Sequence, residues 1–454
     1  MAPLNCAGPM RRREFLRVGT LALGGLGLSD LLKARAAIGQ PHPDTTVILF
    51  WMWGGPSQLE TYDCKPDAPS EYRGPLRPIR TTVPGLDICE VFPLQAKLGH
   101  RMSLVRSLHH NMSSHNDGSI ELLTGKTPAK EDVTSTAKSD HPDFGMIASK
   151  LRGSPSSGLP SYVGVPRVPF MTQPTYLGMT HSGFASGDPS QANFHPPNLL
   201  LNAGLDGARL DDRRGLVTQL DRYRRATDLH GAADATDQFR QQAFQLLTSS
   251  AVANAFALDQ EKPETRERYG RHLWGQSCLL ARRLAEAGAS VITIDARSPV
   301  ETRQIFFSWD DHANPATGWN LEEAMRWRGP YMDQGLSALI EDIYARSLDR
   351  KIMVVAVGEF GRTPRLSSPQ GVLGRDHWPS AQSAMISGGG LRMGQVIGAT
   401  TSKAEYPVER PLKPQDLMAT MYRHLGIDYR ASINDFTGRP VQILQDGEPI
   451  RELI

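Results

Sequence analysis

The sequence predicts an α/β fold in three layers, with a mostly parallel central sheet and helices on both of its faces. Compact runs of apolar residues bounded by polar residues or glycine are typical of strands buried on both faces, and they occupy residues 46–52, 102–108, 290–294, 351–357 and, as a further strand, 383–386. Apolar residues at helical spacing occupy 265–287, 331–347 and 415–425. Strands that alternate with helices indicate a doubly wound sheet.

The composition is that of an ordinary globular domain. The chain has 454 residues, of which 39% are hydrophobic and 22% are charged, so it is long enough to bury a large core. We expect residues 37–454 to form a single domain with a loop-rich insertion around 126–200, and residues 210–260 to be helical. The glycine-rich run at 388–394 is interpreted as a turn and not as a dinucleotide loop, because no clear helix follows it.

The first 36 residues predict an export signal. A twin-arginine pattern at Arg12-Arg13 precedes a glycine-diluted apolar stretch at 18–32 and a small-residue cleavage site at 34–36. A basic amphipathic surface helix is the alternative. We expect the twin-arginine export machinery to deliver the folded chain to the periplasm or the extracellular space. No later segment reaches the roughly 20 apolar residues of a membrane span, so none is expected in the mature chain.

The charge and the cysteines exclude some classes of protein. Without residues 1–36, the chain holds 44 Lys and Arg against 46 Asp and Glu, a formal net charge of −2. Nucleic-acid binding is therefore not expected, because it usually needs a basic surface. The remaining cysteines are Cys64, Cys89 and Cys278, without a C-x-x-C pair. A Cys64–Cys89 disulfide and free thiols are both open.

Acidic and imidazole side chains follow two of the predicted strands. Glu359 and Arg362 come directly after the strand at 351–357, and Asp376-His377 follows soon afterwards. Carboxylates and imidazoles are ligands of divalent Zn, Mn, Mg or Ca. A buried salt bridge with a surface turn is the alternative for these residues.

A second pair, Asp310 and His312, lies after the strand at 290–294. Residues two apart in an extended segment point the same way, so this pair is suited to chelating a metal. A solvated acidic loop is the alternative. Because ligands bind at the carboxyl ends of the strands in open parallel sheets, we expect both groups at one edge.

Two further segments follow the remaining strands. Ser114 and His115 lie between the strand at 102–108 and a helix expected to end at Thr124-Gly125. A helix start attracts anions, although Ser114 or Asn116 can equally be the helix N-cap. After the first strand, Glu60 or Asp63 could complete a metal shell, or serve as ordinary loop residues.

The motifs together resemble a known family. They are W-G-G-P-S at 53–57, L-T-G at 123–125, W-D-D-H at 309–312, G-E-F-G-R-T-P at 358–364 and G-R-D-H-W at 374–378. In this order, after a twin-arginine leader, they resemble the bacterial domain-of-unknown-function family fifteen-oh-one, which is grouped with the alkaline phosphatase and sulfatase superfamily. The C-terminal segment 414–428 also resembles a sulfatase ending.

The resemblance implies an alkaline-phosphatase-like fold and a site of one or two metals that hydrolyses phosphate or sulfate esters. By this resemblance, Asp310, His312 and His377 would bind a metal. Glu359 would stand where the superfamily has an Asp ligand, with Asp376 nearby, and Arg362 would contact the anionic ester.

The sequence departs from the superfamily pattern at two points. Trp53-Gly54-Gly55 stands where an Asp ligand usually follows the first strand, which leaves Glu60 or Asp63 as substitutes. Counting back from Thr124, the usual nucleophile position holds His115, with Ser114 beside it. Because no Cys-x-Pro-x-Arg signature is present, formylglycine sulfatase chemistry is not expected.

Two functions follow. The first is a metal-dependent hydrolase of a small-molecule or polysaccharide phosphate or sulfate ester. In it, Ser114 or a metal-bound hydroxide attacks, and His115 is a ligand or an acid/base. The second is a non-catalytic relative that binds a polysaccharide or a surface partner.

Overall fold

The central sheet has eight strands among the residues that the computed structural model describes, which are 44–196, 249–300, 308–315 and 319–454. Their order across the sheet is β12 (Val396–Ile397), β4 (Met102–Leu108), β11 (Gln382–Gly388), β8 (Ile352–Val357), β1 (Thr46–Trp51), β7 (Val291–Asp295), β5 (Tyr162–Val165) and β6 (Phe184–Ala185). Only β11 runs antiparallel to its neighbours β4 and β8. The predicted mostly parallel α/β sheet is confirmed.

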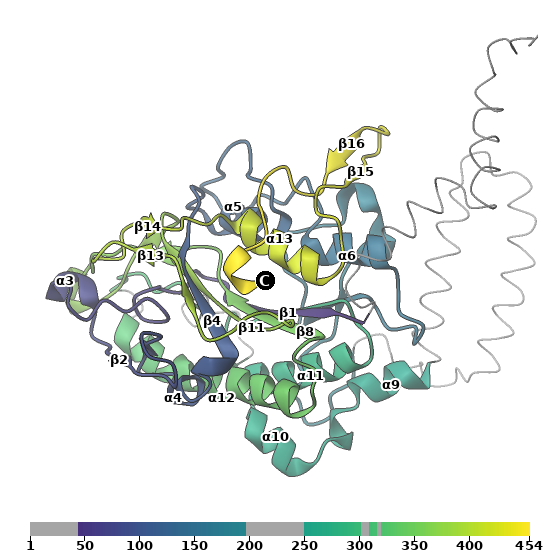
Figure 1. Cartoon of the computed structure of the whole chain (residues 1–454), viewed down its shortest axis with the longest axis horizontal. Helices are drawn as coiled ribbons and strands as arrows, with labels where there is room; N and C mark the ends of the chain where they lie inside the picture. Colours follow the sequence, from purple (N-terminus) through teal and green to yellow (C-terminus); the bar gives the residue numbers. More distant parts are fainter. Residues whose placement is uncertain (1–43, 197–248, 301–307, 316–318) are drawn as a thin grey trace, which may run out of the picture. The chain divides into compact units, whose positions relative to one another are not determined.

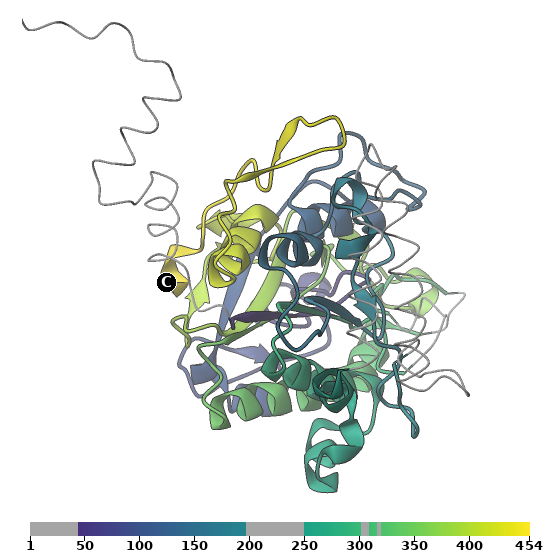
Figure 2. The ribbon, with the colours of Figure 1, turned by 90° about the vertical axis from the view of Figure 1, so that its right-hand side faces the viewer.

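The two faces of β1 pack into two different helical layers. Ile48 and Phe50 belong to the core cluster that includes α11 (Leu273–Glu286) and α12 (Leu321–Ala345). Val47 and Leu49 face the opposite cluster, which includes α5 (His115–Thr124), α6 (Phe144–Arg152) and α13 (Pro414–His424). Figure 1 shows these two helical layers on opposite sides of the sheet, and Figure 2 shows them again after a 90° turn. Burial on both faces explains why the strands are continuous apolar runs.

The predicted helices agree with the structure to different degrees. Helix α13 lies within one residue of the predicted bounds, whereas α12 begins earlier, at Leu321, where Asn320 and Glu323 form a capping box. The helix predicted over 265–287 is two helices, α10 (Pro263–Tyr269) and α11. The chain breaks at Gly270, whose φ of 93° cannot continue a helix.

Part of the segment 126–200, which we expected to be a loop-rich insertion, belongs to the central sheet. Strand β5 pairs in parallel with β7, and β6 extends the sheet beyond it. Helix α6 begins at an N-cap, Asp143, and buries Phe144 against the sheet. The sequence did not indicate this strand because β5 has four residues, too few to produce a hydrophobic run among prolines and glycines. The predicted leader and most of 210–260 lie outside the described residues.

The remaining elements are short. The helical ones are α3 (Ser70–Arg73), α4 (Pro93–Ala96), α9 (Ser250–Phe256), η1 (Gly99–Arg101), η2 (Thr175–Leu177), η3 (Met179–His181), η4 (Leu258–Gln260), η6 (Pro369–Gly371) and η7 (Arg451–Leu453). The two-stranded sheets join β2 (Pro78–Ile79) to β3 (Ile88–Cys89), β9 (Gly361–Arg362) to β10 (His377–Trp378), β13 (Ala399–Thr400) to β14 (Pro407–Glu409) and β15 (Ser432–Asn434) to β16 (Pro440–Gln442).

Three further sequence expectations concern local features. The glycine-rich run is a turn, in which Gly388, Gly389 and Gly390 have φ values of 72°, 70° and 67°. Cys64, Cys89 and Cys278 are free thiols. Within the described part of the chain, no helix is both long enough and apolar enough to cross a bilayer.

The strands bring the predicted site segments to one edge. Strands β1, β7 and β8 are parallel neighbours, and β4 runs in the same direction because it pairs antiparallel with β11, as β8 does. Trp53-Gly54, Asp310 and Glu359 follow β1, β7 and β8 in the sequence, and His115 begins the helix that follows β4. This edge is where an open parallel sheet places its ligands.

Candidate metal centre

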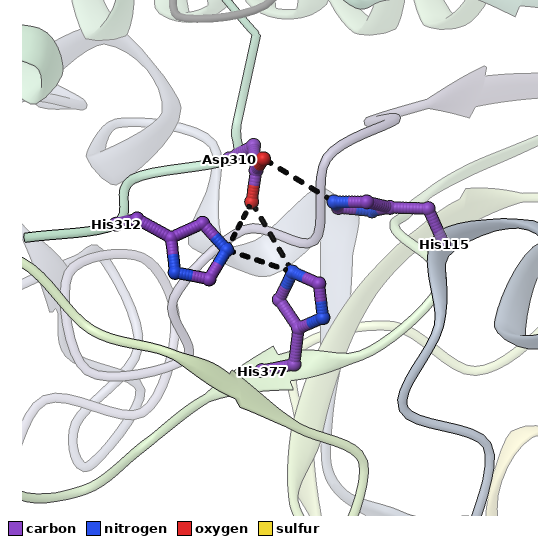
Figure 3. Close-up of side chains that lie close together, drawn as sticks. All are labelled: His115, Asp310, His312 and His377. Atoms are coloured by element: carbon purple, nitrogen blue, oxygen red, sulfur yellow. Dashed lines mark hydrogen bonds and ion pairs between the residues drawn. The ribbon is translucent and has the colours of Figure 1, made fainter. Parts of the chain in front are cut away.

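Four side chains converge at this edge of the sheet. His115, Asp310, His312 and His377 each offer one ligand atom, and these atoms all lie within 4.8 Å of one another (Figure 3). His115 is the first residue of α5, Asp310 and His312 lie in the loop that follows β7, and His377 lies in β10. Three of the segments singled out in the sequence therefore meet.

Neighbouring side chains of the four lie at the distances of metal ligands, although the four atoms together span up to 4.8 Å. Asp310 Oδ1 lies 3.0 Å from His312 Nε2 and 3.3 Å from His377 Nε2, and the two Nε2 atoms are 3.0 Å apart. On the other side, Asp310 Oδ2 lies 3.3 Å from His115 Nε2. A tetrahedral cation with bonds of about 2.0–2.1 Å keeps its ligands about 3.3 Å apart. The contacts between neighbouring side chains fit this geometry.

Each imidazole ring is held in place by a contact at the ring nitrogen that faces away from the other three side chains of the candidate metal centre. An oxygen atom lies within hydrogen-bond distance of every Nδ1. The pairs are His115 with Glu359 Oε1 at 2.8 Å, His312 with Asp376 Oδ1 at 2.8 Å, and His377 with the Ser113 carbonyl at 2.6 Å. A ring that donates its Nδ1–H in this way presents the Nε2 lone pair on its opposite side. In all three rings that side faces the group.

Such a group needs a positive charge at its centre. Two Nε2 lone pairs at 3.0 Å repel each other unless a proton or a cation lies between them. Burial lowers the pKa of His115, but its contacts with Asp310 and Glu359 outweigh burial and raise the pKa to about 9. Its Nε2 is buried and makes no hydrogen bond, since the 3.3 Å contact with Asp310 is an ion pair only. The donor set therefore fits a divalent cation, which would replace the proton.

Arg362 holds the carboxylate of this group. Its guanidinium is fully buried and donates from Nη2 to Asp310 Oδ1 at 2.5 Å and to the Gly54 carbonyl, and from Nε to the Gly55 carbonyl at 2.7 Å. Burial would raise the pKa of Asp310, but Arg362 and the histidines hold it well below its usual range. We expected Arg362 to contact an ester. In this structure its guanidinium has no exposed surface and contacts Asp310, so contact with an ester stays a prediction.

Glu359 and Asp376, predicted as ligands, stand behind the histidines. The fully buried Glu359 Oε1 accepts from the Gly54 N–H at 2.8 Å, besides contacting His115. Asp376 is bound to His312 on the solvent side, where 64% of its side chain is exposed. Neither belongs to the four converging side chains, and each contacts the outer ring nitrogen of one histidine.

Glu60 and Asp63 are not brought to the group. The buried Glu60 carboxylate accepts from Arg375 Nε at 2.9 Å and from Nη2 at 2.8 Å. Asp63 pairs with Lys65 at 2.9 Å and lies 3.6 Å from Arg106. Glu60 thus forms a buried ion pair with Arg375 of the G-R-D-H-W segment and is not among the four converging side chains, so its role as a ligand stays a prediction.

Ser114 is the N-cap of α5. Its Oγ accepts from the Asp117 N–H at 3.4 Å and donates to Asp117 Oδ2 at 2.9 Å. The side chain is buried, with the residue 7% exposed. The capping interpretation is confirmed, and a role as nucleophile remains a prediction.

The sequence analysis did not identify the glycines that allow the loops of the candidate metal centre to approach one another closely. Gly54 has a φ of 114°, and a Cβ there would lie 2.6 Å from the Asp310 nitrogen. A Cβ at Gly374 would clash with the backbone of His312 and Ala313. For Gly54 the signal was present in the W-G-G-P-S motif, since glycine shortly after a buried strand often marks a close backbone contact.

Comparisons with known proteins give the following similarities. A search of curated proteins found no match. Similar solved structures include the lipoteichoic acid synthase LtaP from Listeria monocytogenes (11% identity, 89% of this chain, 75% of that chain, TM-score 0.39) and the PsFucS1 sulfatase from Pseudoalteromonas sp. (12% identity, 92% of this chain, 72% of that chain, TM-score 0.38). The C-terminal periplasmic domain of EcEptC from Escherichia coli, in complex with Zn, has 12% identity over 85% of this chain and 83% of that chain, with a TM-score of 0.35.

The match to a family covers nearly all of the chain that follows the predicted leader. It extends over residues 44–454 and therefore includes every strand of the central sheet and all four side chains of the candidate metal centre. The chain belongs to the family described as "Protein of unknown function (DUF1501)".

Proposed function

We propose that the chain binds one divalent cation through His115, Asp310, His312 and His377 and hydrolyses a phosphate or sulfate ester outside the cytoplasm. One observation carries the proposal: four ligand atoms lie within 4.8 Å of one another while every outer ring nitrogen contacts an oxygen. Histidines that bind a metal almost always have their outer ring nitrogen fixed in this way.

The donor set favours zinc among the four metals expected from the sequence. Three imidazoles and one carboxylate match the ligands that zinc takes in proteins, with manganese second. Calcium and magnesium prefer shells made of oxygen, which this group does not provide. The family resemblance of the motifs supports the same kind of centre.

The catalytic proposal assigns a task to each part of the site. A bound cation would polarise the ester oxygens and offset their charge. The chain's own residues hold the geometry: Glu359 and Asp376 orient two rings, and Arg362 holds Asp310. The start of α5 favours an oxyanion. Ser114 is our candidate nucleophile, because Asp117 Oδ2 at 2.9 Å can accept its proton.

A non-catalytic binding protein is the second candidate. It is favoured by the burial of Ser114, which already caps α5, and by a carboxylate of the chain itself, Glu131, that occupies N–H groups before this helix. Such a protein would keep the cation to bind a polysaccharide or a surface partner.

Elemental analysis combined with turnover separates the two candidates. The mature chain is purified, its metal content is measured, and aryl phosphate and aryl sulfate are tested as substrates. The hydrolase predicts bound metal and turnover, both lost in His377→Ala and both kept in the folded fraction of Glu60→Gln, whose carboxylate lies outside the group. Bound metal without turnover on either substrate supports the binding protein.

The export route is a separate proposal based on the leader. We propose that the twin-arginine machinery carries the chain to the periplasm or beyond. Replacing Arg12 and Arg13 by lysine is expected to leave the precursor in the cytoplasm, as cell fractionation would detect. Unchanged export of this variant would contradict the proposed route.

A further inference from the structure

A carboxylate of the chain itself lies at the start of α5, beside the candidate metal centre. Glu131 Oε1 accepts three hydrogen bonds, from the Ser113 N–H at 2.5 Å, the Ser113 hydroxyl at 2.8 Å and the Ser114 N–H at 2.7 Å. Three donors that meet on one oxygen form an anion-binding position. Here the anion is a side chain of the chain itself, and it lies 17 residues after Ser114 in the sequence.

The segment that carries Glu131, residues 127–137, makes a second contact with the start of α5. The Asp132 N–H donates to Asp117 Oδ2 at 2.5 Å, and this carboxylate oxygen also accepts from Ser114. The Asp132 carboxylate in turn accepts from N–H groups of Thr134, Thr136 and Ala137, so the segment forms a turn of its own. The segment is therefore an ordered strap across the start of α5.

Glu131 is not needed to cap the helix. Ser114 already accepts from the Asp117 N–H as the N-cap, and the donors to Glu131 belong to the two residues that precede the first helical residue. The same Ser113 whose N–H binds Glu131 accepts from His377 through its carbonyl at 2.6 Å. The next residue after Ser114 is His115, whose buried Nε2 makes no hydrogen bond. The anion-binding position thus adjoins two of the four candidate ligands.

We propose that Glu131 is an internal competitor for the substrate, and that its carboxylate occupies the position that the phosphate or sulfate group of an ester would take. The strap 127–137 then has to leave the start of α5 before such an anion can bind. This inference rests on the proposed function, because it takes the metal centre to be the place where the ester reacts.

Anion binding by strap variants tests the inference. Binding of inorganic phosphate and sulfate to the zinc-loaded mature chain is measured by calorimetry for the wild type, Glu131→Ala and Asp140→Asn. The last is the matched control, because it removes one exposed carboxylate from the same part of the chain without touching α5. We expect Glu131→Ala to bind phosphate at least about tenfold more tightly, and Asp140→Asn to bind it as the wild type does. Equal or weaker binding by Glu131→Ala would overturn the inference.

Two further measurements keep the test decisive. If Glu131→Ala does not fold, Glu131→Gln keeps an acceptor for the three donors without the charge, and a smaller gain in phosphate affinity is expected. In the wild type, saturating phosphate should speed tryptic cleavage after Lys130 in the strap, and protection of this bond would count against the inference.

Failure of the metal proposal is distinguishable from failure of this one. Zinc content is measured for every variant, and phosphate binding is repeated on the metal-free chain. If zinc is absent but Glu131→Ala still gains phosphate affinity, the strap competes for the helix start and the metal proposal falls. If zinc is present and the affinity does not change, the strap is only structural and the metal proposal stands.

Discussion

Replacing Glu359 by glutamine should weaken zinc binding far more than replacing Asp376 by asparagine. The two carboxylates make the same contact, 2.8 Å to the Nδ1 of a candidate ligand. Both substitutions keep an oxygen that can accept this hydrogen bond and remove only the charge. The two sites differ in burial, since Glu359 is fully buried and 64% of the Asp376 side chain is exposed.

The size of each effect follows from this difference in burial. A carboxylate behind a metal-binding histidine contributes about 10–100-fold to affinity, which is about 1.4–2.7 kcal/mol, and the buried Glu359 should lie at the upper end. An exposed ion pair contributes about 0.2–1 kcal/mol, so Asp376→Asn should cost at most about fivefold.

Competition with a zinc chelator measures both affinities. The metal-free wild type and the two variants are titrated at one pH and one ionic strength, after circular dichroism has established that each is folded. Equal losses in the two variants, or a larger loss for Asp376→Asn, would refute the argument that burial sets the strength of these contacts.

Three other predictions concern stability and the shape of the site. Burial raises the pKa of Asp143 to about 6, so the chain loses roughly 3 kcal/mol of stability as pH rises from about 3 to about 7, through the pKa of the folded state. Urea unfolding of the wild type should show this loss relative to Asp143→Asn, and a difference between the two that stays constant over this range would contradict the prediction. Glu60→Gln breaks a buried ion pair with Arg375, so it should lower the free energy of unfolding by about 3–5 kcal/mol and leave the zinc affinity of the folded chain unchanged. A loss of zinc affinity in the folded variant would instead indicate that Glu60 is a ligand. Gly54→Ala should lower the free energy of unfolding by about 1–3 kcal/mol and should also lower zinc affinity, because residue 54 has a φ of 114° and the new Cβ would press on the Asp310 nitrogen. Thermal unfolding and calorimetry should detect the two losses, and wild-type values in both would contradict the close approach of the two loops.

The sequence predicted the fold and the edge of the sheet where the site lies, for one physical reason. Strands buried on both faces must be apolar throughout, and such runs stand out in a chain of mixed composition. Since parallel strands end at one edge, residues that follow different strands were expected to meet there. His115, Asp310, His312 and His377 do meet, although they lie in three separate segments.

The sequence could not separate ligands from the residues that hold them. Asp310 and Glu359 both follow buried strands, but only the tertiary structure directs Glu359 to the outer nitrogen of His115. Glu60 pairs with Arg375, a residue 315 positions away, and no local pattern indicates such a partner. Strand β5 was missed because its four residues become a strand only through pairing with β7.

A crystal of the zinc-loaded mature chain, with diffraction recorded at the zinc absorption edge, tests the central claim most directly. We predict one anomalous peak per chain, about 2.0–2.2 Å from the Nε2 atoms of His115, His312 and His377 and from a carboxylate oxygen of Asp310. A chain that binds no zinc, or a peak that lies away from these four side chains, would contradict the proposed metal centre.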